Sequence, residues 1–196
     1  MADVVLFHHV QGLTDGVRAL ADSLSAGGRR VVTPDLFDGA RPRTLDEGMA
    51  LDRDLGNVTL RERAERAIAG LAEDVVYAGV SLGVGVAQEF AQTRPGARGA
   101  LLYEGCLPVV GEWAVGPWPE GLAVQIHGMS RDPYFALGGD LEAARELVAV
   151  AGDDRAALFV YEGDQHLFTD SSLASYDADA TQLVLQRSLE FLDRFG

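Results

Sequence analysis

Hydrophobic residues gather in six short runs, which are separated by longer segments of mixed polarity. Each run is mostly apolar and short enough to be a strand buried on both faces, which is typical of parallel sheets. Most of the intervening segments have the length and spacing of amphipathic helices. The chain therefore predicts an α/β fold: a doubly wound, mostly parallel sheet with helices on both faces. The expected strands are 3–8, 29–33, 74–80, 99–104, 122–127 and 157–161.

Four apolar stripes at helical spacing accompany these runs, and a further helix is expected at 84–91, directly after the third strand. Glycines end the first stripe, at Gly27 and Gly28, and the third, at Gly152. The stripes are Val17, Leu20, Ala21 and Leu24; Val58, Ala64, Ile68 and Leu71; Leu141, Ala144, Leu147 and Ala151; and Leu185, Leu189 and Leu192.

Two long stretches, 37–57 and 105–121, show neither helical nor strand periodicity, so irregular connections are expected there. Long loops at this end of a sheet often act as lids or line pockets. Aromatic residues in the second stretch either line a pocket or cover the sheet edge, and arginines in the first either bind a substrate carboxylate or belong to a solvated loop. The residues concerned are Trp113 and Trp118, and Arg41, Arg43 and Arg53.

Composition places the chain among single-domain proteins. It has 196 residues, seven prolines and no low-complexity linker, so one domain spanning 1–196 is expected. The net charge of −14, from 30 acidic and 16 basic residues, argues against nucleic acid or an anionic membrane as a partner. No signal-peptide pattern and no membrane-length apolar run is visible, and a lone cysteine, Cys106, excludes an internal disulfide. We expect a cytoplasmic monomer or small homo-oligomer.

The sequence shows no cofactor-binding motif. No cluster of His, Cys, Asp and Glu has metal-ligand spacing, and no phosphate-binding loop is present. The sequence therefore predicts neither a metal nor any other cofactor.

The most informative motif is the Gly-x-Ser-x-Gly pattern at 79–83. It lies between an apolar run and a helix-like segment, which is the strand–turn–helix context of a nucleophile elbow. Flanking glycines remove Cβ atoms that would clash in so tight a turn, and the amide of Leu82 would face a developing oxyanion. The alternative is a glycine-rich turn in which Ser81 only caps the helix.

A nucleophilic serine needs a base, and the chain has four histidines. In α/β-hydrolases the triad runs in the order Ser, then Asp or Glu, then His. His166 is the histidine that leaves room for a strand and an acid between itself and the serine. A plain surface histidine is the alternative reading of this loop residue. The other three histidines are His8, His9 and His127.

The acid is expected just after the strand that precedes the one leading to the histidine. Asp132 follows that strand by a short turn, and Pro133 fixes the chain after it. A carboxylate there would accept the imidazole N–H and set the tautomer that can take the serine proton. The alternative is a structural Asp-Pro turn. Competing acids are Asp153, Asp154 and Asp164.

Taken together, these segments resemble the dienelactone hydrolase family of α/β-hydrolases over nearly the whole chain. Residues 8–13, followed by a helix and then by 31–37, look like the family's opening strand, oxyanion turn and "APDL" segment. The elbow follows, and 161–170 is similar to the family's "YPGAGHxF" histidine loop. The resemblance implies a minimal α/β-hydrolase fold without a large cap domain, and acyl hydrolysis as the activity.

The chain departs from the best-known members in two ways. Those members carry cysteine in a Gly-x-Cys-x-Gly-Gly elbow, whereas this chain has Ser81 and, in place of the second glycine of the pair, Val84. They also have a glutamate just before the residue whose amide completes the oxyanion hole, and here that place is His9. A serine needs no thiolate control, so the departures are consistent with each other. They argue against dienelactone as the substrate.

The oxyanion hole is expected at the backbone amides of Val10 and Leu82. Residues 9–12 end the first strand as a sharp turn beside the elbow, and Leu82 follows the nucleophile. The side chain of His9 would either contact the substrate beside this hole or be a surface residue at a strand end. Tyr134, two residues after Asp132, is a further candidate for the substrate pocket.

Two classes of function follow. The first is a serine-dependent hydrolase of small carboxylic esters or lactones that acts through an acyl-enzyme, with Ser81, Asp132 and His166 as the triad. The second is a catalytically idle α/β-hydrolase domain that binds a small ligand in the same cleft. All three triad residue types occur in the expected order, which favours the first, because an idle relative would be free to lose any of them.

Overall fold

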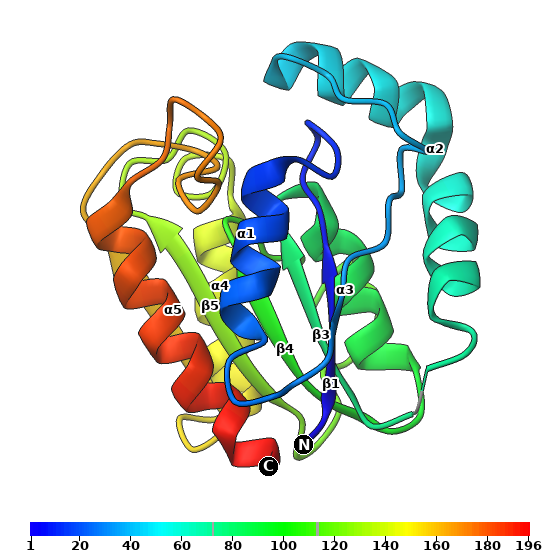
Figure 1. Ribbon diagram of the computed structural model, residues 1–196. Helices are drawn as coiled ribbons and strands as arrows, with labels where there is room; N and C mark the ends of the chain where they lie inside the picture. The colour runs from blue at the N-terminus through cyan, green and yellow to red at the C-terminus, as the bar shows by residue number, and fades with distance from the viewer. Residues whose placement is uncertain (72, 113) are drawn as a thin grey trace.

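A six-stranded parallel sheet forms the centre of the protein, in the order β2-β1-β3-β4-β5-β6 (Figure 1). The structure is a computed structural model that describes residues 1–71, 73–112 and 114–196. The strands are β1 (Asp3–Phe7), β2 (Val31–Val32), β3 (Val75–Val80), β4 (Ala97–Tyr103), β5 (Ala123–Met129) and β6 (Ala156–Tyr161). All six predicted strands are found, and the predicted fold class is confirmed.

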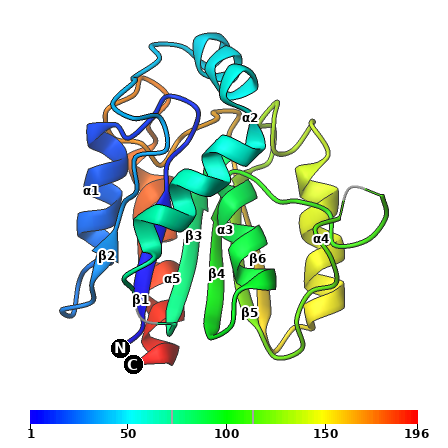
Figure 2. The same ribbon diagram turned by 90° about the vertical axis from the view of Figure 1, so that its right-hand side faces the viewer.

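Helices cover both faces of this sheet, as Figures 1 and 2 show from two sides. Successive residues of β1 alternate between two apolar cores, with Val4 and Leu6 in one and Val5 and Phe7 in the other. The first core is closed by α1 and α5, and the second by α2, α3 and α4. The helices are α1 (Asp15–Leu24), α2 (Leu45–Ile68), α3 (Leu82–Thr93), α4 (Asp140–Ala151), α5 (Ala178–Leu192) and a short 3₁₀ helix (Asp193–Phe195).

The first long connection is shorter than predicted, because α2 begins at Leu45 within the stretch expected to be irregular. The Thr44 side chain caps this helix by accepting a hydrogen bond from the Glu47 amide at 3.2 Å. Gly56 interrupts the helix with a φ of 73°, so the two halves turn different faces inward and no single apolar stripe results. The prediction is wrong for Val58, a residue of the second predicted stripe, because its side chain is 73% exposed.

The other predicted helices are found where they were expected, but some of the residues on their buried faces differ from the prediction. In α5 the buried face carries Val184, Ser188 and Phe191, whereas the predicted Leu185 and Leu189 are only partly buried. A polar residue lies on the buried face because the Ser188 hydroxyl accepts a hydrogen bond from the Tyr103 hydroxyl at 2.9 Å.

The second connection, 105–121, has no helix or strand within its described residues. Trp118 is buried in the core on the α3 and α4 face, and its ring N–H donates to the carbonyl oxygen of Leu122 at 3.0 Å. It therefore covers the sheet. Trp113 lies outside the described residues.

Every helix within the described ranges is too short or too polar to span a lipid bilayer.

Candidate active site

Ser81 stands in a strained turn between β3 and α3. Its φ is 50° and its ψ is −113°, a conformation that side-chain-bearing residues rarely adopt. The flanking glycines permit it: a Cβ on Gly79 would lie 2.3 Å from the Gly83 carbonyl oxygen, and one on Gly83 equally close to that of Phe7. The Ser81 amide donates to the carbonyl oxygen of Tyr103 at 2.8 Å, which ties the turn to β4. The sequence motif thus forms the tight elbow that it predicts.

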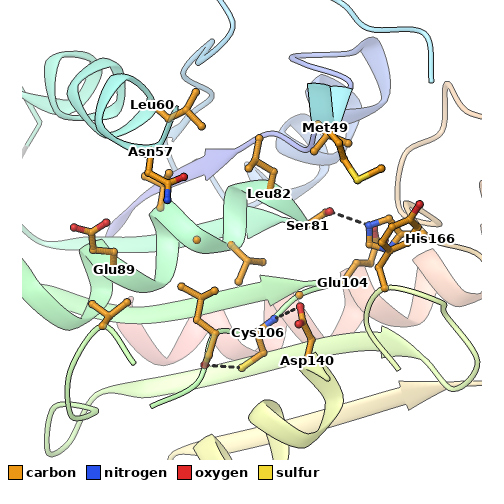
Figure 3. Close-up of a pocket in the computed structure, with 18 of the residues that line it drawn as sticks. Met49, Asn57, Leu60, Ser81, Leu82, Glu89, Glu104, Cys106, Asp140 and His166 are labelled. Carbon is orange, nitrogen blue, oxygen red and sulfur yellow. Dashed lines mark hydrogen bonds between the residues drawn. The ribbon is translucent and has the colours of Figure 1, made fainter. Parts of the chain in front are cut away.

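His166 lies within hydrogen-bond distance of the serine, with its Nε2 atom 2.8 Å from Oγ of Ser81 (Figure 3). On the other side of the ring, Nδ1 lies 2.7 Å from Oδ2 of Asp132. Since the carboxylate can only accept, the proton is on Nδ1 and Nε2 is free to accept from the serine hydroxyl. This is the tautomer that a general base requires.

Asp132 is fully buried and its position is fixed by the backbone. Its second oxygen accepts hydrogen bonds from the amides of Tyr134 at 2.8 Å and Phe135 at 3.2 Å. The loops after β5 and β6 are joined by a hydrogen bond from the Arg131 amide to the Gly163 carbonyl oxygen at 2.9 Å. Asp132 therefore holds the His166 ring from a rigid support.

Two of the other histidines, His127 and His8, are buried in the interior of the protein. Both nitrogens of His127 are engaged, by the hydroxyl of Tyr161 at 2.8 Å and by Oε1 of Gln125 at 2.9 Å. Burial lowers the pKa of His127 to about 3, and the charge of Arg187 acts in the same direction. His8 is equally buried, and burial lowers its pKa to about 4.

Two backbone amides near Ser81 are free to bind an anion. Val10 and Leu82 both line the cavity beside the serine. Among the hydrogen bonds between described residues, none is donated by the amide of either one. Leu82 is the first residue of α3, where the helix dipole favours negative charge. Gly48 of α2 packs on the same turn, since a Cβ there would lie 2.2 Å from the Val10 carbonyl oxygen.

The structure corrects the placement of His9, whose side chain is fully buried and absent from the residues that line the cavity. Its Nδ1 accepts a hydrogen bond from the Gln11 amide at 3.1 Å, so its Nε2 carries the proton and donates to Asp170 at 2.7 Å. Asp170 also binds Thr14 and Ser172. His9 is neither a substrate contact nor a surface residue, because this network holds it inside the turn that carries Val10.

Burial by itself would raise the pKa of Asp170. Hydrogen bonds from His9, Ser172 and Thr14 outweigh burial and lower this pKa to about 2. The network therefore contains a carboxylate, which joins the loop after His166 to the oxyanion turn and to the start of α1. Neighbouring residues in the sequence gave no sign of this link, because 161 positions separate the two partners.

A cavity of about 490 Å³ opens at the serine, and its surface is mostly apolar (Figure 3). Tyr134 lines it as predicted, with its ring centroid 4.6 Å from that of His166. Arg41 and Arg43 do not line it, since they pair at the surface with Asp15 and Glu47.

The sequence interpretation missed Glu104, a fully buried acid at the end of β4 that also lines the cavity. Burial raises its pKa, although the hydrogen bonds from Thr169 oppose the shift. One oxygen accepts from the amide and the hydroxyl of Thr169, at 3.0 and 2.9 Å. The signal that could have identified it is an acid directly after an apolar strand, at the edge where the triad residues emerge.

Cys106 lines the same cavity and is buried, and burial raises the pKa of its thiol. It is therefore a packed thiol. Over the described part of the chain, no group of three or more His, Cys, Asp and Glu could hold a metal ion.

Comparison with known proteins identifies the family to which the sequence belongs. The sequence profile of the dienelactone hydrolase family matches residues 1–196. No curated protein matches in sequence.

Solved structures share the fold at low sequence identity. A dienelactone hydrolase-like promiscuous phosphotriesterase from metagenomic libraries is 17% identical with a TM-score of 0.78, covering 100% of this chain and 87% of its own. A cold-adapted esterase from an Arctic intertidal metagenomic library is 17% identical, with a TM-score of 0.67 and coverage of 98% and 82%. Thermogutta terrifontis esterase 2, phosphoramylated by tabun, is 16% identical, with a TM-score of 0.62 and coverage of 100% and 84%. These likenesses concern the fold.

Proposed function

The chain belongs to the dienelactone hydrolase family, and we propose that it hydrolyses small carboxylic esters or lactones through an acyl-enzyme on Ser81. The observation that carries the proposal is the continuous chain of hydrogen bonds from Ser81 through His166 to buried Asp132. A helix cap would not need this arrangement, and the Ser81 side chain makes no capping hydrogen bond to α3.

In the first half of the reaction, Oγ of Ser81 attacks the carbonyl carbon while Nε2 of His166 takes the hydroxyl proton. The carbonyl oxygen becomes an oxyanion and accepts hydrogen bonds from the amides of Val10 and Leu82. Asp132 stabilises the imidazolium that has formed. The tetrahedral intermediate then collapses, and His166 gives its proton to the departing alkoxide, so an alcohol leaves and the acyl group stays on Ser81.

In the second half, water replaces the alcohol. His166 takes a proton from water as it attacks the acyl carbon, and the collapse of the second intermediate returns that proton to Oγ of Ser81. A carboxylic acid is released and the resting hydrogen-bond chain is restored. In a lactone both products remain one molecule, a hydroxy acid.

A fluorophosphonate probe tests the nucleophile, and the tabun-modified esterase of the same fold supports this choice of reagent. We expect one adduct, mapped by mass spectrometry to the peptide that contains Ser81. Ser81→Ala should abolish labelling and lower esterase turnover by at least about a thousandfold, because triad residues act as a unit. Ser130→Ala, a change close to Asp132 in sequence, is the matched control and should still be labelled.

The alternative is a domain that binds a small ligand without turning it over. That reading predicts neither an adduct nor hydrolysis in a folded protein. An adduct at Ser130 or Ser171 in an active enzyme would contradict the assigned nucleophile.

A further inference from the structure

The cavity extends from the serine along α3, well beyond the reacting groups. Figure 3 shows Glu89 at one end of the labelled side chains and His166, which is hydrogen-bonded to Ser81, at the other. Glu89 is the eighth residue of α3, so at 1.5 Å per residue it lies about 12 Å along the helix from the elbow. Aliphatic side chains line the space between them: Leu60, Leu82, Val84, Val86 and Leu107. The lining therefore suits a hydrocarbon chain.

The far end of the cavity carries one cation, and that cation is already paired. Among the described lining residues, Arg61 is the sole lysine or arginine. Its Nη1 lies 2.7 Å from Glu89, and its Nε donates to Glu65 at 3.1 Å. Exposed pairs of this kind add little to stability, but these two use two of the five guanidinium N–H donors and offset its positive charge. Two carboxylates outweigh one guanidinium at this end.

The near end carries two more carboxyl groups, Glu104 and Asp140. Burial raises the pKa of both, so neither environment stabilises a negative charge. Glu104 Oε2 is buried and has no hydrogen-bond partner among the described residues, and Asp140 accepts from the Cys106 amide at 3.1 Å. An anion in the cavity would thus meet carboxyl groups at both ends, and the one cation among the described lining residues already pairs with two carboxylates.

We propose that this site selects uncharged esters or lactones whose aliphatic chain fills the cavity, and discriminates against the same chain ending in a carboxylate. The inference rests on the proposed function, since it names the substrate class of the Ser81 site. A carboxylate would lose water in an apolar space without gaining a cation, and the net charge of −14 adds a repulsive field.

Matched substrates test the inference on both sides of the ester bond. The acyl pair is p-nitrophenyl hexanoate and mono-p-nitrophenyl adipate, which differ by a terminal methyl or carboxylate. The alcohol pair is hexyl acetate and 6-acetoxyhexanoate, which differ in the same way. Each ratio of kcat/KM is divided by the ratio of hydroxide-catalysed rates, which removes differences in intrinsic reactivity.

In the pair whose chain enters the cavity, we expect kcat/KM to be at least about thirtyfold lower for the carboxylate at low salt. The difference should shrink as salt rises, because exposed charges are screened. Corrected ratios near one in both pairs would overturn the inference while leaving a phosphonate adduct on Ser81 intact. No turnover together with no adduct would instead overturn the proposed function, and the inference with it.

Variants at the far end of the cavity provide a second test of the proposed discrimination. Glu89→Gln releases Arg61 from its closer partner, so the discrimination should fall about tenfold. In the double variant that also carries Arg61→Met, the discrimination should return to the wild-type value, because the guanidinium that would bind the carboxylate is gone. Glu190→Gln, an exposed change on α5, is the control and should leave both ratios unchanged. Discrimination that is the same in Glu89→Gln as in the wild type would contradict the role of the pair.

Discussion

Replacing Asp170 with asparagine tests the buried network that supports the oxyanion turn. One oxygen of Asp170 accepts from His9 at 2.7 Å and from Thr14, and the other accepts from the amide and hydroxyl of Ser172 at 2.8 and 2.6 Å. Four donors therefore converge on one carboxylate. An asparagine offers a single acceptor oxygen, so its NH₂ group would face two donors.

The magnitude follows from the pKa and from the mismatched donors. The pKa of Asp170 falls from 3.8 to about 2 in the fold, and a shift of that size corresponds to about 2 kcal/mol. Buried donors that lose their acceptor cost about 1–3 kcal/mol more. We expect Asp170→Asn to lower the free energy of unfolding by about 3–5 kcal/mol at pH 7, the range observed when one partner of a buried pair is removed.

The sign of the pH dependence is fixed by the direction of the shift. Because the folded pKa lies below the unfolded one, the stabilisation is fully present above about pH 5 and is lost as the pH falls from about 4 toward 2. The difference between wild type and Asp170→Asn should therefore be about 1 kcal/mol smaller at pH 3 than at pH 7.

Urea unfolding at both pH values measures this difference directly. Asp15→Asn is the matched control, because Asp15 is 81% exposed and pairs with Arg41 at the surface. That change should stay within about 0.5 kcal/mol of the wild type. A stability loss in Asp170→Asn no larger than in this control, or a loss that grows on acidification, would refute the assigned network.

Three further predictions concern the site and the buried histidines. Asp132→Asn should lower kcat by about 10⁴-fold in a folded protein, since the amide no longer enforces the tautomer of His166, and a loss under about tenfold would contradict its role. Val10→Pro removes an oxyanion donor and should lower kcat by about 10²–10³-fold, whereas Val10→Ala should be mild. Burial lowers the pKa of His8 to about 4 and that of His127 to about 3. As the pH drops below about 6.5, the unfolded chain therefore binds protons that the folded protein does not bind, and the free energy of unfolding should decrease. By pH 4 each should account for about 3 kcal/mol in urea unfolding, and a flat profile from pH 7 to pH 4 would contradict this.

Local pattern was enough to predict the six strands, most of the helices and the chemical types at the centre of the site. Strands buried on both faces leave apolar runs, and parallel order brings their carboxyl ends to one edge. Together with the order Ser, Asp, His that α/β-hydrolases follow, that reasoning predicted Ser81, Asp132 and His166, and in the structure they form one hydrogen-bonded chain. The elbow was equally local, because its backbone strain requires glycines at fixed positions.

Tertiary packing decided what the side chains around this centre do. His9 was expected beside the substrate or at the surface, but Asp170 draws its ring into the interior from the far end of the chain. The first half of α2 has no stripe to reveal it, because part of its apolar surface faces the cavity in place of the core. The pairing of Arg61 with Glu89 arises only where α2 meets α3. A sequence fixes backbone preferences over a few residues, whereas burial and charge pairing depend on which distant segments come into contact.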